Sequence, residues 1–388
     1  MNKNKNTHGY LITHGDVYDG SGSAPSAVDV RIRGGQIVEI APELSAAGDE
    51  VIDATGLLVT PGLIDLHVHV YAGMGVFSVE PAEAGLRTGV TTMLDTGTAG
   101  MLTYAGFRQH VIDRAEEDVF VLLNISMIGC LHAHTEEPYV SDLLDSRLCH
   151  APSALKCVEA NRDRIIGTKV RMTGAIADNK IENERAGLRG AVEVARKAGV
   201  FCMVHHSLSL VPLDEVIDAL APGDVITHLY HPNPDHGFDD DGRPRDAIRR
   251  ARDKGIILDV GHGVGSFDWS IAEPACRTHD FWPDTISTDL HQFNKAGPVF
   301  DMATTMSKFL HLGMPLEQVI AASTHKPAAA MRLDDRFGLL APGRQADVAI
   351  LALEDTSRSL VDVVGASRQA SRMLVVKDTF KRGRRFQR

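Results

Sequence analysis

The pattern of hydrophobic and polar positions divides the chain into three parts, of which the first and last share one pattern. Short segments at 28–32 and 36–40 alternate apolar and polar residues, and the turn residues 33–35 separate them. Alternation with a period of two is typical of half-buried strands, so this stretch predicts a β-hairpin. The C-terminal part repeats the pattern at 346–351 and 373–376. We expect both ends of the chain to form one small β-sandwich together.

The middle of the chain alternates short apolar runs with helix-like segments. Helical patterns occur at 184–198 and 245–254, the second followed by Gly255 at a helix C-cap position. This alternation predicts βαβ units and a parallel sheet. The apolar runs are 63–70, 91–95, 119–125, 165–171, 200–205, 224–229, 256–260 and 285–289.

Eight such repeats over about 250 residues predict an α/β fold of the TIM (β/α)8 type. The expected parts are the first half of the sandwich at 1–60, the barrel at 61–332 and the second half of the sandwich at 333–388. An open doubly wound sheet is the alternative. It is disfavoured because no GxGxxG follows the first strand.

Composition narrows the choice of partners. The chain has 40 basic and 51 acidic residues, a net charge of −11, and its one basic cluster is the tail at 381–385, so nucleic acid is not expected as a partner. Its start lacks the roughly 7 to 15 apolar residues of a signal peptide, and no apolar stretch reaches the ~18 residues of a membrane span. Five irregularly spaced cysteines without a CxxC favour reduced thiols and a cytoplasmic location. The sequence leaves open whether the chain forms a homo-oligomer.

The first candidate for chemistry is His67-Val68-His69, at the end of an apolar run. Alternate side chains of a strand point to the same face, so both imidazoles can reach one point, where a metal could bind. Two ordinary histidines on a half-buried strand would give the same pattern. Polar residues at the ends of four later runs favour the metal site, because catalytic residues of a TIM barrel lie at the C-terminal ends of its strands. They are Lys169, His205, His228 and Asp289.

In this order of strand-end residues the chain resembles the amidohydrolase superfamily. The resemblance extends over nearly the whole chain and includes the segments 51–56 and 338–348. It implies that His67, His69 and Asp289 hold the more buried metal ion and that His205 and His228 hold the more exposed one. It also implies that Lys169, carboxylated on its amine, bridges both ions.

This ligand set has a consistent chemistry. Neutral imidazoles and carboxylates suit Zn²⁺, and a carbamate turns a cationic lysine into an anionic ligand that two ions can share. Two metal ions lower the pKa of a bridging water, which gives a hydroxide near neutral pH. Asp289 could take the proton of this hydroxide and pass it to the leaving group. The expected reaction is hydrolysis of an acyl bond.

Two further histidine motifs are interpreted differently. His206 follows His205 directly and must point to the opposite face of the strand, so we expect it to pack away from the metals. A second HxH, His132-Ala133-His134, lies in the longest strand-to-helix connection. No strand-end acid accompanies it, and we expect it to belong to a loop that covers the substrate.

Several neighbouring residues bear on the substrate. Deaminases of the superfamily carry a glutamate beside the strand-five histidine, where this chain has His206-Ser207, so deamination is disfavoured. Dihydroorotase-like enzymes carry an arginine just after the HxH, where this chain has residues 70–73 without one. Arg171 lies on the same strand face as Lys169 and could clamp a substrate carboxylate, or it could form a structural ion pair.

The segments 169–172, 259–267 and 287–291 resemble a subgroup of amidohydrolase/deacetylase metallohydrolases. That resemblance implies hydrolysis of small acyl carboxylates, such as acetyl-mandelate and other O-acetyl 2-hydroxy acids, or N-acyl amino acids. Tyr230 and His262 are then candidates to bind the substrate, or only to shape its pocket. A cyclic amide hydrolase like dihydroorotase or dihydropyrimidinase is the alternative. A non-catalytic interaction protein is disfavoured, because all six ligand positions are filled.

Overall fold

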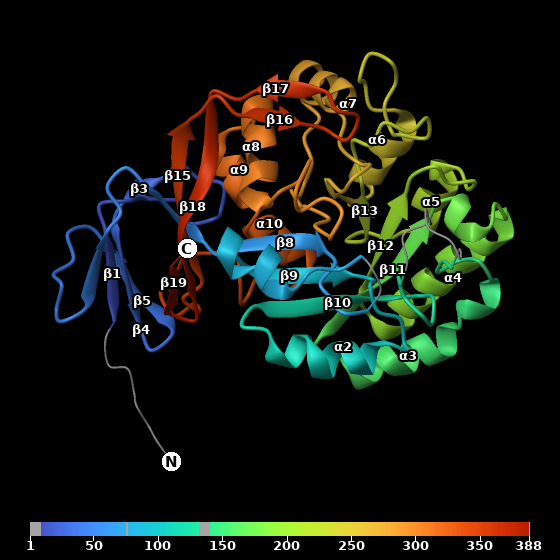
Figure 1. The fold of residues 1–388 in the computed structure, drawn as a ribbon, viewed down its shortest axis with the longest axis horizontal. Coiled ribbons are helices and arrows are strands. Elements are labelled where there is room, and N and C mark those ends of the chain that lie inside the picture. Colours follow the sequence, from blue (N-terminus) through green and yellow to red (C-terminus); the bar gives the residue numbers. More distant parts are fainter. Residues whose placement is uncertain (1–8, 75–76, 132–139, 388) are drawn as a thin grey trace.

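A computed structural model describes residues 9–74, 77–131 and 140–387 of the chain. Its largest part is a parallel sheet of seven strands that are hydrogen-bonded in sequence order (Figure 1). The strands are β8 (Leu63–Val68), β9 (Val90–Thr96), β10 (Asp118–Asn124), β11 (Ile165–Met172), β12 (Phe201–His206), β13 (Val225–Thr227) and β14 (Ile257–Leu258).

The eighth apolar run closes this sheet. Parallel bridges join Thr285 to Asp259 after β14, and Leu290 to Val68 of β8. The amide of His69 also donates to the carbonyl of Leu290, at 3.0 Å. Although residues 285–290 do not form a regular strand, they occupy the eighth position of the barrel. The predicted fold class is therefore confirmed.

Helices connect the strands along the outside of the barrel (Figure 1). The predicted helix at 184–198 is the C-terminal part of α4 (Ile181–Ala198), which ends at Gly199 with a φ of 70°. The helix expected at 245–254 is α6 (Asp246–Asp253), and Gly255 follows with a φ of 79°. The left-handed region suits glycine, which explains both ends. The other α-helices are α1 (Pro81–Ala84), α2 (Tyr104–His110), α3 (Ala151–Ala160), α5 (Leu213–Ala219), α7 (Trp269–Glu273), α8 (Met302–Leu312), α9 (Leu316–Ala321) and α10 (His325–Ala330).

The two ends of the chain form two mixed sheets that share one apolar core. The first sheet contains β1 (Tyr10–Thr13), β4 (Asp29–Arg33), β5 (Gln36–Ala41) and β6 (Glu50–Asp53). The second contains β2 (Asp16–Val17), β3 (Ser26–Ala27), β7 (Leu58–Pro61), β15 (Val348–Asp355), β18 (Arg372–Lys381) and β19 (Arg384–Gln387). Ile12 and Ile32 from the first sheet pack in one cluster with Val59, Ile350 and Phe380 from the second. The predicted hairpin is β4–β5, and the shared unit of both termini is confirmed.

A buried ion-pair network joins this unit to the barrel. Asp118, at the start of β10, accepts from the Lys381 ammonium at 2.7 Å and also pairs with Arg382. The same ammonium lies 2.7 Å from Asp347, which precedes β15. Both Asp118 and Lys381 are almost fully buried.

A short hairpin leaves the sandwich and packs on the barrel (Figure 1). It consists of β16 (Ser359–Val361) and β17 (Ser367–Gln369). The amide of Val363 in its turn donates to the carbonyl of Phe267 at 3.1 Å. The sequence pattern did not indicate this contact, because three-residue strands carry too little periodicity to reveal where they pack.

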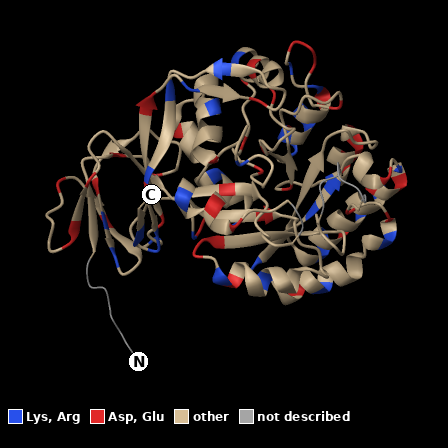
Figure 2. Ribbon diagram, viewed as in Figure 1, with Lys and Arg blue, Asp and Glu red and all other residues tan. Residues whose placement is uncertain are grey.

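Charged residues of both signs are interspersed over the helices of the barrel (Figure 2). In the described part of the chain, no helix is both long and apolar enough to cross a membrane.

Candidate metal centre and active-site cavity

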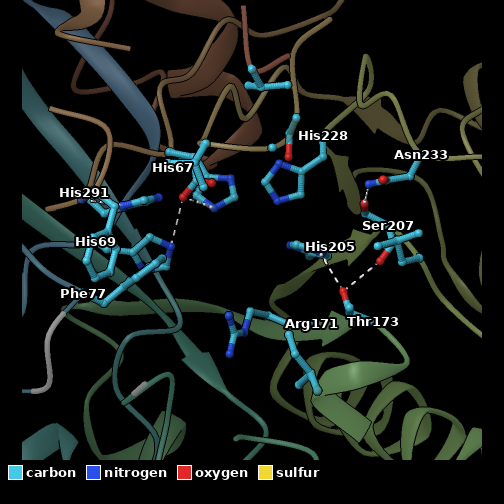
Figure 3. Close-up of a pocket in the computed structure, with 18 of the residues that line it drawn as sticks. His67, His69, Phe77, Arg171, Thr173, His205, Ser207, His228, Asn233 and His291 are labelled. Atoms are coloured by element: carbon cyan, nitrogen blue, oxygen red, sulfur yellow. Dashed lines mark hydrogen bonds and ion pairs between the residues drawn. The ribbon is translucent and has the colours of Figure 1, made fainter. Parts of the chain in front are cut away.

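A cavity of about 520 Å³ opens at the C-terminal ends of the barrel strands (Figure 3). All six predicted metal ligands line it. They are His67 on β8, His69 directly after β8, Lys169 on β11, His205 on β12, His228 directly after β13 and Asp289 in the segment 285–290 that closes the barrel. The other residues of its lining are Phe77, Arg171, Thr173, Ile176, Ser207, Leu208, Pro232, Asn233, Val264, Gly265, Ser266, His291, Phe293, Val363 and Val364.

The tautomers of His67 and His69 are set by hydroxyl groups. Nδ1 of His67 lies 3.0 Å from Oγ1 of Thr227, whose hydroxyl donates to the buried carboxylate of Asp259 at 2.7 Å. Nδ1 of His69 lies 2.8 Å from Oγ1 of Thr98, which donates in turn to a buried aspartate at 2.8 Å. Because each hydroxyl hydrogen is used, each Nδ1–H must donate to it. The free lone pair of both rings is therefore on Nε2.

These lone pairs converge on a carboxylate. The Nε2 atoms of His67 and His69 lie 3.4 and 3.1 Å from Oδ1 of Asp289. Burial holds the pKa of both histidines well below the ordinary value, so they are neutral. Oδ1 of Asp289 is buried without a hydrogen-bond donor among the described residues.

Three facing lone pairs repel one another, and a cation between them would be a favourable partner for all three. Ligand atoms of His67, His228 and Asp289 all lie within 4.8 Å of one another, and all three residues are buried. Neutral imidazoles with a carboxylate are the donor set that Zn²⁺ and similar divalent ions prefer. The residues present therefore fit a divalent metal ion.

His205 and His228 form a second pair beside the first. Their ring centroids lie 4.3 Å apart. Nδ1 of His228 lies 2.6 Å from the carbonyl of Gly261, so Nδ1 carries the hydrogen and Nε2 the lone pair. Nε2 of His205 lies 3.1 Å from Oγ1 of Thr173, whose hydroxyl donates to the carbonyl of Ser207 at 2.8 Å. The lone pair of His205 is therefore on Nδ1.

The backbone at this site is strained where it presents ligands. His228 has a φ of 72° and Asp289 a φ of 49°, in the left-handed region that side chains other than glycine rarely adopt. Such strain persists where the surrounding structure holds it in place, and it is common at functional sites. At Gly261 a Cβ atom would lie only 2.1 Å from Oγ1 of Thr227. The close approach of this loop to the ligands therefore requires glycine.

Lys169 on β11 is buried among these ligands. Its Nζ atom lies 3.2 Å from Sδ of Met203, and burial lowers its pKa to about 8. The charge of Lys169 depresses the pKa of His67, His69, His205 and His228, so the amine lies close to all four. A permanent ammonium at this position would repel a metal ion held by these histidines.

Arg171 lines the cavity but already has an anionic partner. Its Nε donates to Oδ2 of Asp142 at 3.0 Å, and its Nη2 donates to Oδ1. Asp142 also accepts from the side-chain amide of Asn124, at 3.2 Å. Of the two roles that the sequence left open for Arg171, the structural ion pair is therefore present. The sequence did not predict Asp142 as its partner, because Asp142 lies in a long connection without a periodic pattern.

Tyr230 and His262 are buried outside the lining of this cavity. The hydroxyl of Tyr230 donates to the carbonyl of Phe281 at 2.9 Å. The ring of His262 stacks on Phe267, and Nζ of Lys308 lies 2.5 Å from its Nε2. Both side chains thus contact other parts of the protein, and this geometry does not support the substrate-binding roles predicted for them.

The remaining histidine motifs differ in outcome. His206 is buried, and its Nε2 donates to the carbonyl of Val211 at 3.0 Å. This position agrees with the packing role expected for it. The motif at 132–134 lies outside the described residues.

Other lining residues were missed. Nδ1 of His291 accepts from the amide of Phe293 at 3.2 Å, and its ring stacks on Phe77 at 4.2 Å between centroids. Burial lowers the pKa of His291 to about 4, so the ring is neutral with its hydrogen on Nε2. Its place two residues after Asp289 was a usable signal. Phe77, Thr173 and Asn233 lie in loops, where the sequence pattern gave no signal that they line the cavity.

A barrel that presents neutral histidines and a carboxylate to one another at its strand ends is typical of enzymes with a metal centre. The model of the amidohydrolase family matches residues 58–260 and 268–385. The chain belongs to this family.

The relatives carry more than one activity in their names. A deacetylase from Agrobacterium fabrum is 36% identical over 349 residues, which is 89% of this chain and 83% of that protein. A deacetylase from Brucella anthropi is 36% identical over 87% of this chain and 82% of its own length. A crystal structure of a dihydroorotase superposes with a TM-score of 0.87 at 32% identity, over 98% of this chain and 97% of that chain. A crystal structure of an adenine deaminase superposes with a TM-score of 0.88 at 29% identity, over 98% of this chain and 100% of that chain.

Proposed function

We propose that this protein is a binuclear metal-dependent hydrolase that cleaves the acyl ester or amide bond of small α-acyl carboxylates. Candidate substrates are acetyl-mandelate and other O-acetyl 2-hydroxy acids, and N-acyl amino acids. The observation that carries the proposal is Oδ1 of Asp289, which has no hydrogen-bond donor in the described part of the chain and is buried between the lone pairs of His67 and His69. The deacetylase relatives support the choice of reaction.

Two zinc ions are the proposed cofactors. His67, His69 and Asp289 would hold one ion, and His205 and His228 the other. Lys169, carboxylated on Nζ, would bridge them, because a carbamate removes the positive charge that otherwise lies among the histidines. Bound there, the two ions would supply an activated water and would polarise the scissile carbonyl.

Asp289 is the proposed proton carrier. Hydrolysis adds water across the acyl bond: the new acid keeps the hydroxyl oxygen, and the alcohol or amine leaves with a proton. The buried carboxylate of Asp289 lines the cavity, where it would accept that proton. The carboxylate would pass the proton to the leaving oxygen or nitrogen, so that no strong base is released.

Arg171 is the proposed clamp for the substrate carboxylate, together with the neutral donor His291. Both line the cavity. Asp142 holds the guanidinium in one orientation through two of its nitrogens. A fixed guanidinium that faces the cavity binds a carboxylate with less loss of side-chain entropy than a free one.

Two other reactions within the family are the alternatives to this proposal. The likeness to a dihydroorotase structure favours a cyclic amide hydrolase as the second candidate. Residues 70–73 lack the arginine expected for such a substrate. Against deamination stands His206-Ser207, in place of a glutamate beside His205.

The test is a substrate panel on the zinc-loaded protein. It should contain O-acetyl and N-acyl carboxylates, cyclic amides such as dihydroorotate and hydantoins, and adenine. We expect acetate release from one or more acyl carboxylates and no turnover of the rings. Turnover of a cyclic amide or of adenine, with inert acyl carboxylates, would overturn the proposal.

A further inference from the structure

The outer part of the cavity is lined by exposed apolar side chains. Ten large hydrophobic side chains are exposed among the described residues, and four of them line this one cavity. They are Leu208, Val264, Phe293 and Val364, whose exposed fractions are 54%, 47%, 47% and 59%. Single exposed hydrophobic residues are ordinary, but four around one opening indicate a binding surface. We call these four residues the apolar collar.

The collar is assembled from four separate segments. Leu208 follows β12, Val264 follows β14, Phe293 follows the closing segment of the barrel, and Val364 lies in the turn between β16 and β17. Phe77, Ile176 and Val363 add apolar side chains to the same lining, and the ring centroid of Phe77 lies 4.6 Å from that of His69.

Polar side chains also line the cavity. Phe77 and His291 lie on one side of the metal ligands, whereas Thr173, Ser207 and Asn233 lie on the other (Figure 3). The side-chain amide of Asn233 donates to Ser207 at 2.7 Å, so these two polar groups are already paired with each other. The four exposed side chains of the collar itself present only apolar atoms to a substituent that reaches them.

The hairpin that carries Val364 is fixed to the barrel. The carboxylate of Asp362 accepts from the amides of Trp269 at 3.1 Å, Val364 at 3.0 Å and Ala366 at 2.8 Å. Nζ of Lys308, itself buried, donates to the carbonyl of Val361 at 2.6 Å. A wall held in this way discriminates between substituents by shape and polarity, because little of it has to be ordered on binding.

We propose that the apolar collar binds the side chain of the substrate and thereby sets the substrate class. This inference rests on the proposed function. The enzyme selects acyl carboxylates with a branched aliphatic or aromatic side chain over those with a hydroxyl, carboxyl or amino group. The reason is that a polar side chain would lose its water at the collar without gaining a partner, whereas an apolar one gains by burial.

The test measures binding separately from hydrolysis. Hydroxamates chelate metal centres without being cleaved, so the affinities of ligands with different tails can be compared without turnover. Calorimetry on the zinc-loaded protein compares 4-methylpentanohydroxamate with the polar 4-hydroxybutanohydroxamate. We expect the apolar ligand to bind about tenfold more tightly, on the scale of a few buried methyl groups.

Val364→Ser should reduce this preference to about threefold or less, because it removes one wall of the collar. The matched control is Val51→Ser, at a valine that is 51% exposed on β6 of the sandwich. It should keep the full preference. Equal affinity for both ligands in the wild type, or an unchanged preference in Val364→Ser, would overturn the inference.

A kinetic comparison separates this inference from the proposed function. Wild-type enzyme should hydrolyse N-acetyl-leucine more efficiently than N-acetyl-serine, and Val364→Ser should narrow the ratio. A retained preference among hydroxamates with no hydrolysis of any acyl carboxylate would contradict the proposed reaction and leave the collar supported. Hydrolysis of both substrates at equal efficiency, with equal hydroxamate affinities, would contradict the collar alone.

Discussion

At the scale of single residues, the cavity brings together the six side chains that could hold metal ions. His67, His69, Lys169, His205, His228 and Asp289 all reach one cavity, as their strand-end positions predicted. Strand ends of a barrel meet at one face, so position along the sequence translates directly into position in space. Residues in loops have no such rule. For this reason Asp142 and Phe77 were missed, and the predicted substrate contacts Tyr230 and His262 are buried outside the lining of the cavity.

Asp289 provides the first prediction. Asp289→Asn keeps the size of the side chain but removes the proton acceptor, so turnover should fall by on the order of 10² or more, the scale of a positioned general base. Steady-state kinetics on protein of verified metal content would measure the loss. Near-normal turnover would remove Asp289 from the mechanism.

Arg171 provides the second. If it clamps the substrate carboxylate, Arg171→Met should cost about 2 to 4 kcal/mol in kcat/KM for acyl carboxylates, because the bound carboxylate of the substrate loses its charged partner. Neutral esters of the same acids are the matched control and should lose much less. Equal losses for both substrate series at unchanged metal content would assign Arg171 to structure, through its pair with Asp142.

At the scale of elements, neighbouring strands hold each other's ligands in place. Thr227 at the end of β13 orients His67 of β8, and Thr98 after β9 orients His69. The regular strands and long helices were predictable because their periodic patterns are long. The irregular closing segment at 285–290 and the hairpin β16–β17 were harder, since tertiary contacts rather than local pattern determine where they pack.

This arrangement predicts the effect of removing one hydroxyl. Thr227→Val should weaken metal binding by about 10- to 100-fold, the range for the loss of a partner that orients a metal-binding histidine. Thr92→Val on β9 is the matched control, because the Thr92 hydroxyl is buried without a hydrogen-bond partner among the described residues. Zinc titration against a competing chelator measures both variants. Equal zinc affinity in Thr227→Val and wild type would contradict the orienting role.

At the scale of the whole molecule, the sandwich and the barrel are connected through buried charges. Burial by itself raises the pKa of Asp118, but Lys381 and Arg382 outweigh it and hold the pKa below the ordinary value of 3.8. That both termini build one unit was predictable from their shared strand pattern. The ion-pair network between that unit and the barrel was not, because its members are far apart in sequence.

The network predicts a pH-dependent stability. Asp118→Asn should lower the free energy of unfolding by roughly 3 kcal/mol at neutral pH, because it leaves buried cations with one anion fewer. Since the folded-state pKa of Asp118 is lowered from 3.8, its contribution is fully present well above pH 4 and is lost as the pH falls through the lowered folded-state pKa. The difference between wild type and variant in denaturant unfolding should therefore shrink in acid. A difference that stays constant down to pH 3 would contradict the ion-pair account.

The most direct test of the central claim, a two-ion centre bridged by Lys169, is the zinc content of the purified protein by elemental analysis. The matched variant is Lys169→Ala, which retains His67, His69, His205, His228 and Asp289. After growth with zinc, the account predicts two equivalents per chain in the wild type and one or fewer in the variant. One equivalent or none in the wild type, or two retained in Lys169→Ala, would contradict it.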